Sequence, residues 1–292
     1  MIPRFEAPLV RALLRDQHPD LADLPLREVD GGWDNHVWRL GDDLAVRLPR
    51  TSRGPGLLLA EQTWVPVLAG LLPLPVPAPV RVGRPSELLD RPWTVARWVT
   101  GTPADLAPLG VVAAGTLARA LRCLHVPAPE GAPRSDSRGV PLARALLPEH
   151  VLDEVVDDAS RARLDAVWRA ALAAPAWDGA PRWLHGDLHP ANVVGDEHGD
   201  LVGLLDFGDL CAGDPATDLS AAWLLLPDGA AEPFLDAYGA TDGATSARAR
   251  GWAVLRAVGL LQIGRAGRLG LAGGKPTWEP AGRAALRRVL AV

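Results

Sequence analysis

Asp187, Asn192 and Asp206 form a short series of oxygen-bearing side chains in the middle of the chain. Carboxylate and amide oxygens are hard ligands of the kind that Mg²⁺ prefers. Phosphoryl transfer requires a protein mainly to align a nucleotide with an acceptor, to position the acceptor hydroxyl and to balance phosphate charge with a divalent metal. One carboxylate facing the hydroxyl, with a second carboxylate and an amide on the metal, would meet these requirements.

A short hairpin is expected to position these side chains. Residues 193–195 and 201–205 are apolar, strand-like runs, and the residues between them (DEHGD) are polar and favour a turn. Asn192 directly precedes the first run and Asp206 directly follows the second. The sequence therefore predicts that these two side chains meet at the open end of the hairpin, with Asp187 on the loop just before it.

At these positions the chain resembles a known family. Residues 185–192 (HGDLHPAN) and 205–209 (LDFGD) are similar to the catalytic loop and metal-binding motif of the aminoglycoside phosphotransferase family, which is related to choline kinases and protein kinases. The resemblance implies that Asp187 is the catalytic base and that Asn192 and Asp206 bind Mg²⁺. Either motif alone could be an ordinary loop or strand end, but both in this order around a hairpin are more specific.

Three further residues are expected to support the catalytic loop. His185 is assigned to hydrogen bonds that hold the loop rather than to substrate contact. His189 stands where protein kinases normally carry a lysine, which points to the small-molecule branch of the family. Asp218 lies in the first turn of a helix that Asp214 and Pro215 are expected to start. The resemblance implies that Asp218 also braces the loop.

The remaining sequence predicts an α+β chain of two lobes. Residues 1–100 are expected to form a small antiparallel sheet with one main helix, and residues 101–292 a larger, mostly helical lobe that contains the hairpin. Together with the resemblance, this predicts the bilobal, protein-kinase-like fold, with nucleotide binding in the first lobe and catalysis and acceptor binding in the second. Strands are predicted at 26–32, 36–41, 43–49 and 92–99, the first-lobe helix at 55–71, and second-lobe helices at 107–125, 141–173, 215–238, 245–270 and 280–291.

The sequence evidence for the nucleotide-binding part of the predicted site is weaker. Residues 31–36 (GGWDNH), with Gly32, Trp33 and Asn35 as candidate contacts, lie between two strands where kinases have a glycine-rich loop. The usual glycine spacing is missing, so a plain hairpin turn is an equal alternative. By resemblance, the backbone of Arg97, Trp98 and Val99 is the hinge that would meet the purine.

Arg47 occupies the strand position where kinases usually carry a phosphate-binding lysine. A guanidinium group can bind phosphate in a bidentate manner, and Lys275 is the only lysine in the chain. Glu61, on the following helix, is the expected ion-pair partner of Arg47. The alternative is that both are ordinary surface charges.

An acidic stretch offers a candidate acceptor site. Residues 148–158 carry five carboxylates and no arginine, namely Glu149, Asp153, Glu154, Asp157 and Asp158. By resemblance, a helical insert in this place lines the acceptor site, and its acidic groups neutralise the ammonium groups of a cationic, hydroxylated small molecule. A solvated helix face is an equally good interpretation, because charge runs usually are that.

Composition excludes several classes of protein. A net charge of −5 and a pI near 5.8 argue against nucleic-acid binding. No apolar run approaches the ~20 residues that cross a bilayer. The N-terminal sequence lacks the pattern of a secretory signal, so a cytoplasmic protein is expected.

Three functional hypotheses follow. The first is an ATP- or GTP-dependent, Mg²⁺-dependent kinase that phosphorylates a hydroxyl of an aminoglycoside or similar antibiotic and so confers resistance. The second is a metabolic kinase of the same fold, for choline, a sugar, a fructosamine or homoserine. The third is a catalytically inactive nucleotide-binding module, against which the intact Asp187, Asn192 and Asp206 count.

Overall fold

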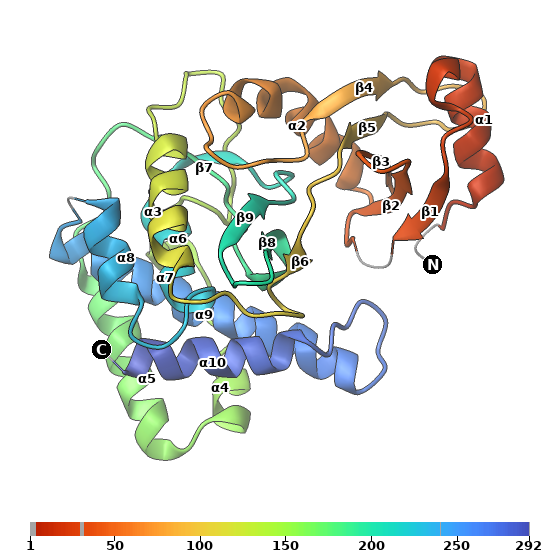
Figure 1. Cartoon of the computed structure of the whole chain (residues 1–292). Coiled ribbons are helices and arrows are strands. Elements are labelled where there is room, and N and C mark those ends of the chain that lie inside the picture. Colours follow the sequence, from red (N-terminus) through yellow and green to blue (C-terminus); the bar gives the residue numbers. More distant parts are fainter. Residues whose placement is uncertain (1–3, 30–31, 240, 292) are drawn as a thin grey trace. The chain divides into compact units, whose positions relative to one another are not determined.

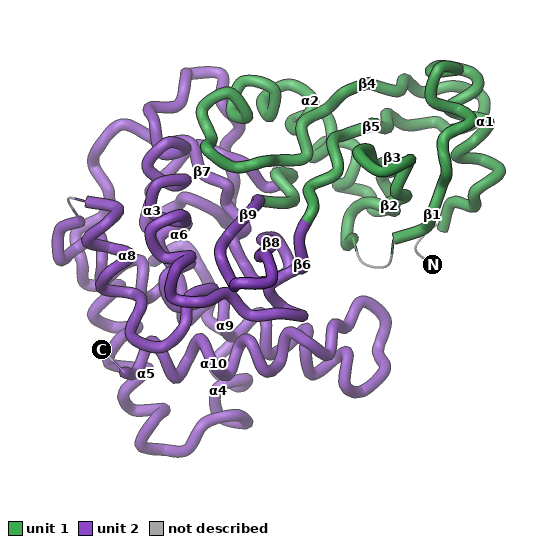
Figure 2. The backbone as a smooth tube through the Cα atoms, in the orientation of Figure 1, with its two compact units in different colours: residues 1–100, 204–208 green, residues 101–203, 209–292 purple. Residues whose placement is uncertain are grey.

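The computed structural model of the chain describes residues 4–29, 32–239 and 241–291. The chain divides into two compact units (Figure 2). The first comprises residues 1–100 and 204–208, and the second comprises residues 101–203 and 209–292. The short return segment assigns Asp206 to the first unit, whereas Asp187 and Asn192 belong to the second.

A five-stranded sheet forms the centre of the first unit, with strand order β1-β2-β3-β5-β4 and antiparallel pairing throughout (Figure 1). Its strands are β1 Leu26–Val29, β2 Asn35–Leu40, β3 Leu44–Pro49, β4 Pro79–Gly83 and β5 Trp93–Arg97. The main helix, α2, spans Gly54–Ala69 and packs on β3, β4 and β5. Pro66 lies inside α2 on its exposed side, and the helix continues past it.

A helix that the sequence patterns did not predict covers part of this sheet. Helix α1 spans Ala7–Gln17 and buries Val10, Leu13 and Leu14 against sheet residues that include Trp38 and Trp93. The strand β4 was also missed, because the alternating prolines that precede it favour an extended path without a ladder. The apolar contacts of α1 and β4 complete the core of the first unit.

Two small sheets frame the loop that carries Asp187 in the second unit. Strands β8 (Val193–Gly195) and β9 (Leu201–Leu204) are neighbours, as the hairpin prediction requires, and β6 (Thr102–Pro103) pairs with β8. Strand β7 (Arg182–Leu184) pairs antiparallel with β10 (Cys211–Gly213). Because the loop directly follows β7, this second pair fixes the point at which the loop begins.

The second unit is rich in helices. They are α3 Ala113–Leu124, α4 Glu149–Val155, α5 Asp158–Ala173, α6 Ala216–Leu219, α7 Ala221–Leu224, α8 Ala231–Tyr238, α9 Gly243–Arg268 and α10 Trp278–Leu290. Helices α4, α5, α6, α7 and α10 contact α9, and α3 packs on α8. The predicted α+β class, with a sheet-rich first part and a helical second part, is confirmed.

Two of the predicted long helices are interrupted. Residues 141–173 form α4 and α5 instead of one helix, because Asp157 adopts an extended conformation and its side chain caps α5 by accepting the Ser160 N–H at 2.7 Å. Residues 215–238 are divided by a turn in which the Ala230 N–H donates to the Pro227 carbonyl at 3.1 Å. Local capping and turn chemistry thus overrode the apolar periodicity.

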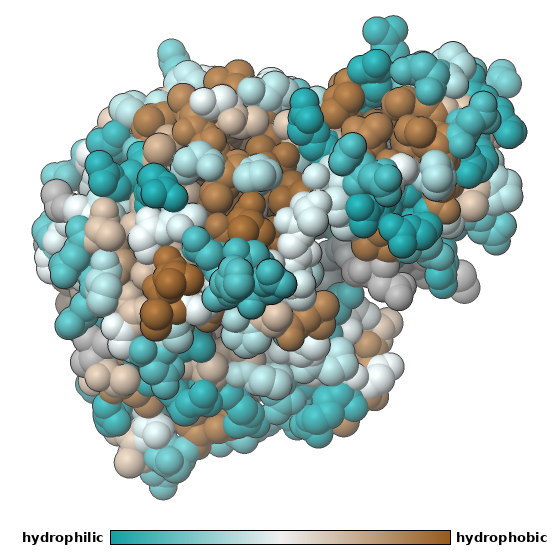
Figure 3. Space-filling view, viewed as in Figure 1, coloured by the Kyte–Doolittle hydropathy of each residue, from teal (hydrophilic) through white to brown (hydrophobic). Residues whose placement is uncertain are grey.

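The surface mixes polar and apolar residues (Figure 3). Exposed large apolar side chains in the second unit include Leu106, Val111 and Leu146. Among the helices that the structure describes, none combines the length and the apolar character needed to cross a membrane.

Candidate functional site

The loop that carries Asp187 runs from β7 to the short 3-10 helix η3 (Pro190–Asn192). Gly186 has a φ of 81°, and a Cβ atom at this position would lie 2.3 Å from the Asp209 carbonyl oxygen. Only glycine can therefore occupy this place without moving the backbone. The close approach packs the loop against the segment that follows the Asp-Phe-Gly motif.

Asp218, on α6, holds the loop through its backbone. Its carboxylate accepts the N–H of His185 at 2.6 Å and the N–H of Gly186 at 2.9 Å. It is buried, and His125 Nε2 lies 3.3 Å from it. Burial alone would raise the pKa of Asp218, but the hydrogen bond and charge of His125 and the backbone N–H of Gly186 outweigh it, so the pKa lies below its usual value.

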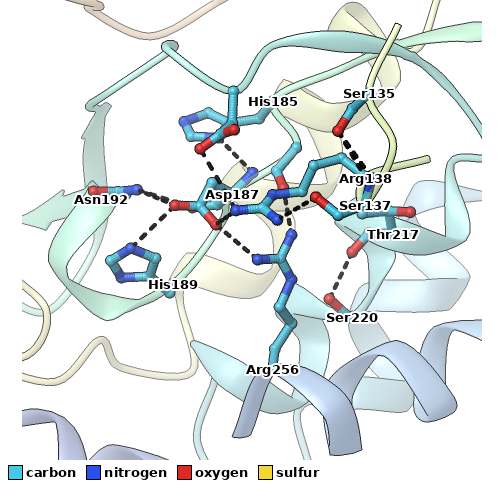
Figure 4. Close-up of polar contacts among 12 residues, drawn as sticks. Ser135, Ser137, Arg138, His185, Asp187, His189, Asn192, Thr217, Ser220 and Arg256 are labelled. Atoms are coloured by element: carbon cyan, nitrogen blue, oxygen red, sulfur yellow. Dashed lines mark hydrogen bonds and ion pairs between the residues drawn. The ribbon is translucent and has the colours of Figure 1, made fainter. Parts of the chain in front are cut away.

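Four nitrogen donors surround the carboxylate of Asp187 (Figure 4). Arg256 Nη1 lies 2.8 Å and Arg138 Nη2 3.3 Å from Oδ1. Asn192 Nδ2 lies 3.4 Å and His189 Nε2 3.5 Å from Oδ2. The His189 Nδ1 accepts the Ala191 N–H at 3.3 Å, so the ring proton of the neutral histidine belongs on Nε2 and faces Asp187.

These donors keep Asp187 ionised. Burial opposes ionisation, but the hydrogen bond of His189 and the charges of Arg256 and Arg138 outweigh it and hold the pKa of Asp187 well below its usual range. The side chain retains 23% of its exposure. Asp187 is thus a charged carboxylate that a small molecule can reach.

The first unit contains a second cluster of charged groups. Arg47 on β3 and Glu61 on α2 form an ion pair with 2.6 Å between Nη1 and Oε2, and both side chains are buried. Arg47 Nη2 also lies 3.7 Å from Asp206 Oδ1. Burial raises the pKa of Glu61, and the charge of Arg47 opposes the rise. The alternative in which Arg47 and Glu61 are separate surface charges does not fit this arrangement.

Asp206 has an unusual backbone conformation. Its φ of 54° is the one positive value at a non-glycine position in the described ranges. Its Oδ1 accepts the Gly208 N–H at 3.3 Å, which closes a local turn. Its side chain is 45% exposed. A strained, exposed carboxylate is a common feature of functional sites.

The turn between β1 and β2 is tied to the segment after β3. The Gly32 and Trp33 carbonyls both accept hydrogen bonds from the Arg50 guanidinium. Gly32 has a φ of 53°, Trp33 is half exposed, and Asn35 is buried at the start of β2. Gly31, the first glycine of the predicted loop, lies outside the described residues. A nucleotide-binding role for this turn stays a prediction.

Two of the three hinge residues already use their N–H groups. The Arg97 N–H donates to the Ala78 carbonyl at 2.9 Å and the Trp98 N–H to the Asp43 carbonyl at 2.7 Å. Within the described part of the chain, no backbone carbonyl accepts the Val99 N–H. If a purine binds at this segment, Val99 is therefore its N–H donor.

A family comparison agrees with this geometry. The model of a phosphotransferase enzyme family, APH, matches residues 25–257, a range that includes Arg47, Asp187, Asn192 and Asp206. The chain belongs to this family. The prediction that it is a phosphotransferase is confirmed.

Solved structures of similar fold include two complexes of an aminoglycoside phosphotransferase. The GDP complex of wild-type aminoglycoside 2'-phosphotransferase-IIIa is 20% identical with a TM-score of 0.68, and the match covers 98% of this chain and 99% of that one. The GDP and kanamycin complex of APH(2'')-IIIa is 21% identical with a TM-score of 0.70, covering 96% and 97%. These matches confirm the protein-kinase-like fold class.

Two other matches concern a macrolide enzyme and a bacterial relative. Macrolide 2'-phosphotransferase MphH from Brachybacterium faecium is 23% identical with a TM-score of 0.61, covering 96% of this chain and 97% of that one. The uncharacterized protein YcbJ of Bacillus subtilis (strain 168) is 43% identical over 42 residues. That second match spans 14% of each protein's length.

The predicted acceptor carboxylates of this phosphotransferase are largely engaged. Arg161 pairs with both Glu149 and Asp153, and Arg265 pairs with Glu154. Asp157 caps α5, and Asp158 occupies the first turn of that helix. The side chains of Glu149 and Asp153 remain more than half exposed. The stretch therefore presents less net negative charge than its sequence suggests.

Sequence reasoning missed three residues beside the catalytic loop of the phosphotransferase. Arg138 comes from the segment between α3 and α4, and Arg256 from the middle of α9. Trp278, at the start of α10, packs on His189 with 4.5 Å between the ring centroids. The usable signal was Arg256 itself, a lone charge in the apolar run of residues 252–261.

The side chains fit the magnesium ion that the family implies. Asn192 Nδ2 donates to the Asp187 carbonyl at 2.9 Å, which directs its amide nitrogen toward the loop and leaves its carbonyl oxygen as a hard ligand. Asp206 offers an exposed carboxylate. Because Asn192 and Asp206 belong to different units, their expected meeting stays a prediction.

Proposed function

We propose that this phosphotransferase transfers the γ-phosphoryl group of ATP or GTP to a hydroxyl group of a small molecule, with Asp187 accepting the O–H of the acceptor. The observation that carries the proposal is the state of the Asp187 carboxylate. It is ionised, partly exposed and fixed by donors on both oxygens. A fixed carboxylate orients the hydroxyl and takes its proton as the phosphorus–oxygen bond forms.

The donor nucleotide is assigned to the first unit. Arg47, held by Glu61, presents a guanidinium for the phosphates, and the Val99 N–H is available to a purine. Asn192 and Asp206 would hold Mg²⁺, which neutralises the phosphate charge when it is bound. The GDP complexes of similar structures support a nucleotide as the phosphate donor.

For the acceptor, we propose an aminoglycoside or a similarly hydroxylated antibiotic. The similar structures include a kanamycin complex and a macrolide phosphotransferase. The second unit has a cavity among α4, α9 and α10, lined by Glu154, Glu279, three arginines and apolar residues such as Leu261. Glu279 follows Trp278, which packs on His189 beside the catalytic loop. The cavity is therefore our candidate for the place where the acceptor binds.

One observation favours the second candidate, a metabolic kinase. The two carboxylates of the cavity are paired with arginines, Glu154 with Arg265 and Glu279 with both Arg268 and Arg283. Three guanidinium groups and two carboxylates suit an acceptor that is neutral or carries both signs of charge better than a polycation. Choline, sugar, fructosamine and homoserine acceptors therefore belong in the same assay.

The test is nucleotide-dependent turnover with a panel of acceptors. ADP or GDP release is measured with aminoglycosides, macrolides, peptide antibiotics and metabolic alcohols, and growth of a susceptible host that expresses the protein is measured alongside. Mg²⁺-dependent modification of an antibiotic, with protection of the host, supports the first candidate. Turnover with a metabolic alcohol alone replaces it by the second. No Mg²⁺-dependent turnover with any acceptor would leave the inactive nucleotide-binding module.

A further inference from the structure

Arg256 makes two contacts with the catalytic loop from a distant helix. Its Nη1 donates to Asp187 Oδ1 at 2.8 Å and its Nη2 donates to the Gly186 carbonyl at 2.5 Å. The guanidinium also lies 6.0 Å from the ring centroid of Trp252, one turn earlier on α9. Only 18% of the side chain is exposed. This partly buried arginine therefore binds both the Gly186 carbonyl and the Asp187 carboxylate.

The two oxygens of Asp187 are not equivalent. Among contacts from the described residues, Oδ1 receives the one within ordinary hydrogen-bond range, the 2.8 Å bond from Arg256. The donors nearest Oδ2, Asn192 Nδ2 and His189 Nε2, lie at 3.4 and 3.5 Å. Oδ2 therefore has weaker partners and is the atom that can accept a new hydrogen bond from an acceptor hydroxyl.

Arg256 and Asp218 bind different groups of the loop. Asp218 accepts the N–H groups of His185 and Gly186. Arg256 donates to the Gly186 carbonyl and to the Asp187 side chain. Asp218 thus holds the backbone of the loop alone. Arg256 reaches the loop from α9 and holds both its backbone and the Asp187 carboxylate (Figure 4).

We propose that Arg256 is a positioning residue for phosphoryl transfer, which holds Asp187 by Oδ1 so that Oδ2 faces the acceptor hydroxyl. The inference rests on the function proposed above for Asp187. Arg138 does not serve as well for this role, because its contact with Oδ1 is longer, at 3.3 Å, and it is shared with Asp209 at 3.5 Å. A displacement of a reacting group by ~1 Å can cost about 10²-fold in rate, so loss of the shortest contact to the carboxylate should matter.

Another arginine on α9 provides a matched control. Arg250 Nη2 donates to the Val289 carbonyl at 2.7 Å, which joins α9 to α10 away from the loop. Like Arg256, it is partly buried and bonds to a backbone carbonyl. Replacement of Arg250 therefore tests whether loss of a partly buried arginine from α9 lowers activity even when that arginine does not contact the loop.

The experiment compares R256Q, R256K and R250Q in steady-state kinetics, after thermal unfolding has shown which variants are folded. We expect R256Q to lower kcat by about 10²-fold with an unchanged KM for the nucleotide, because only the orientation of Asp187 is lost. R256K, which keeps the charge but not the two-pronged geometry, should fall between R256Q and the wild type. R250Q should keep the wild-type kcat. Millimolar guanidinium should restore part of the activity of R256A and should leave the activity of R250A unchanged.

A wild-type kcat in folded R256Q would overturn the proposal, and so would equal losses in R256Q and R250Q. If R256Q does not fold, R256K becomes the deciding variant, and its full activity would also overturn the proposal. A wild-type protein without turnover on any acceptor would instead reject the function proposed for Asp187. In that case, amide hydrogen exchange at residues 185–187 decides the holding role: faster exchange in R256Q than in R250Q supports it, and equal exchange refutes it.

Discussion

Each unit contains a cluster of arginine and carboxylate groups, and the two clusters differ in their access to water. In the first unit, the side chains of Arg47 and Glu61 are 10% and 3% exposed. In the second, Asp187 retains 23% exposure, and Arg138 and Arg256 retain 18% each. The Arg47–Glu61 pair is therefore nearly sealed from water. The Asp187 carboxylate is surrounded by donors but is still partly accessible to water.

This difference separates what each cluster can do. In a sealed pair, each charge is tied to the other, because an unpaired charge in a low-dielectric interior is costly. Such a pair fixes the helix that carries Glu61 against the strand that carries Arg47. In the open cluster, Asp187 has more donors than it needs for charge balance, and one of its oxygens has only long contacts. Mutation of Glu61 should therefore affect mainly stability, and mutation of Asp187 mainly activity.

The largest expected effect is on catalysis. Asp187→Asn keeps the shape of the side chain but removes the proton acceptor, and kcat should fall by roughly 10²–10⁴-fold with little change in nucleotide affinity. Asp209→Asn is the matched control, since Asp209 also contacts Arg138, at 3.5 Å. The measurements are steady-state turnover and nucleotide titration for both variants. Turnover by Asp187→Asn close to that of the wild type would contradict the catalytic assignment.

Mutation of the Arg47–Glu61 pair should mainly lower the stability of the protein. Glu61→Gln leaves the buried charge of Arg47 without its 2.6 Å partner, and the free energy of unfolding should fall by about 3 kcal/mol. Urea unfolding measures the change. Glu28→Gln, which weakens the exposed ion pair with Arg4 and the 2.7 Å contact with His36 Nε2, is the control and should be milder. Equal losses of stability in the two variants would show that burial does not increase the contribution of the Arg47–Glu61 pair.

The sequence revealed the first cluster more readily than the second. Arg47 and Glu61 lie on a strand and the next helix, and the resemblance to kinases was enough to pair them. Arg138 and Arg256 reach Asp187 across 49 and 69 residues. No local pattern encodes such a contact, because it depends on how α9 and the segment after α3 pack around the loop.

The same limit applies to the fold. The first strands, which are short runs separated by turn residues, and the hairpin of β8 and β9 were predictable, because short-range turn chemistry fixes both. Helix α1 and the pairing of β7 with β10 were not, since each depends on tertiary partners. The acidic run at residues 148–158 shows the opposite error: composition suggested free carboxylates, but Arg161 and Arg265 lie outside the run and neutralise several of them.

A smaller effect should follow from Asp206→Asn. This change removes the exposed carboxylate that we assign to Mg²⁺, so the Mg²⁺ concentration for half-maximal turnover should rise roughly 10- to 100-fold. Titration of turnover with Mg²⁺ at fixed nucleotide measures it. An unchanged Mg²⁺ dependence would show that Asp206 does not bind the metal and would move its role toward the contact with Arg47.

The smallest effect tests the acidic run. Arg161→Gln frees Glu149 and Asp153, both more than half exposed, to meet a polycationic acceptor. If these carboxylates face the acceptor, the KM for an aminoglycoside should fall by up to about fivefold, the scale of a single exposed ion pair. The gain should vanish at high ionic strength, because salt screens exposed charges. Arg169→Gln on the same helix, where Arg169 donates to the Asp165 carbonyl, should leave the KM unchanged. A KM that does not respond to Arg161→Gln at low salt would mean that the acidic run is a solvated face, and the metabolic alternative would then gain.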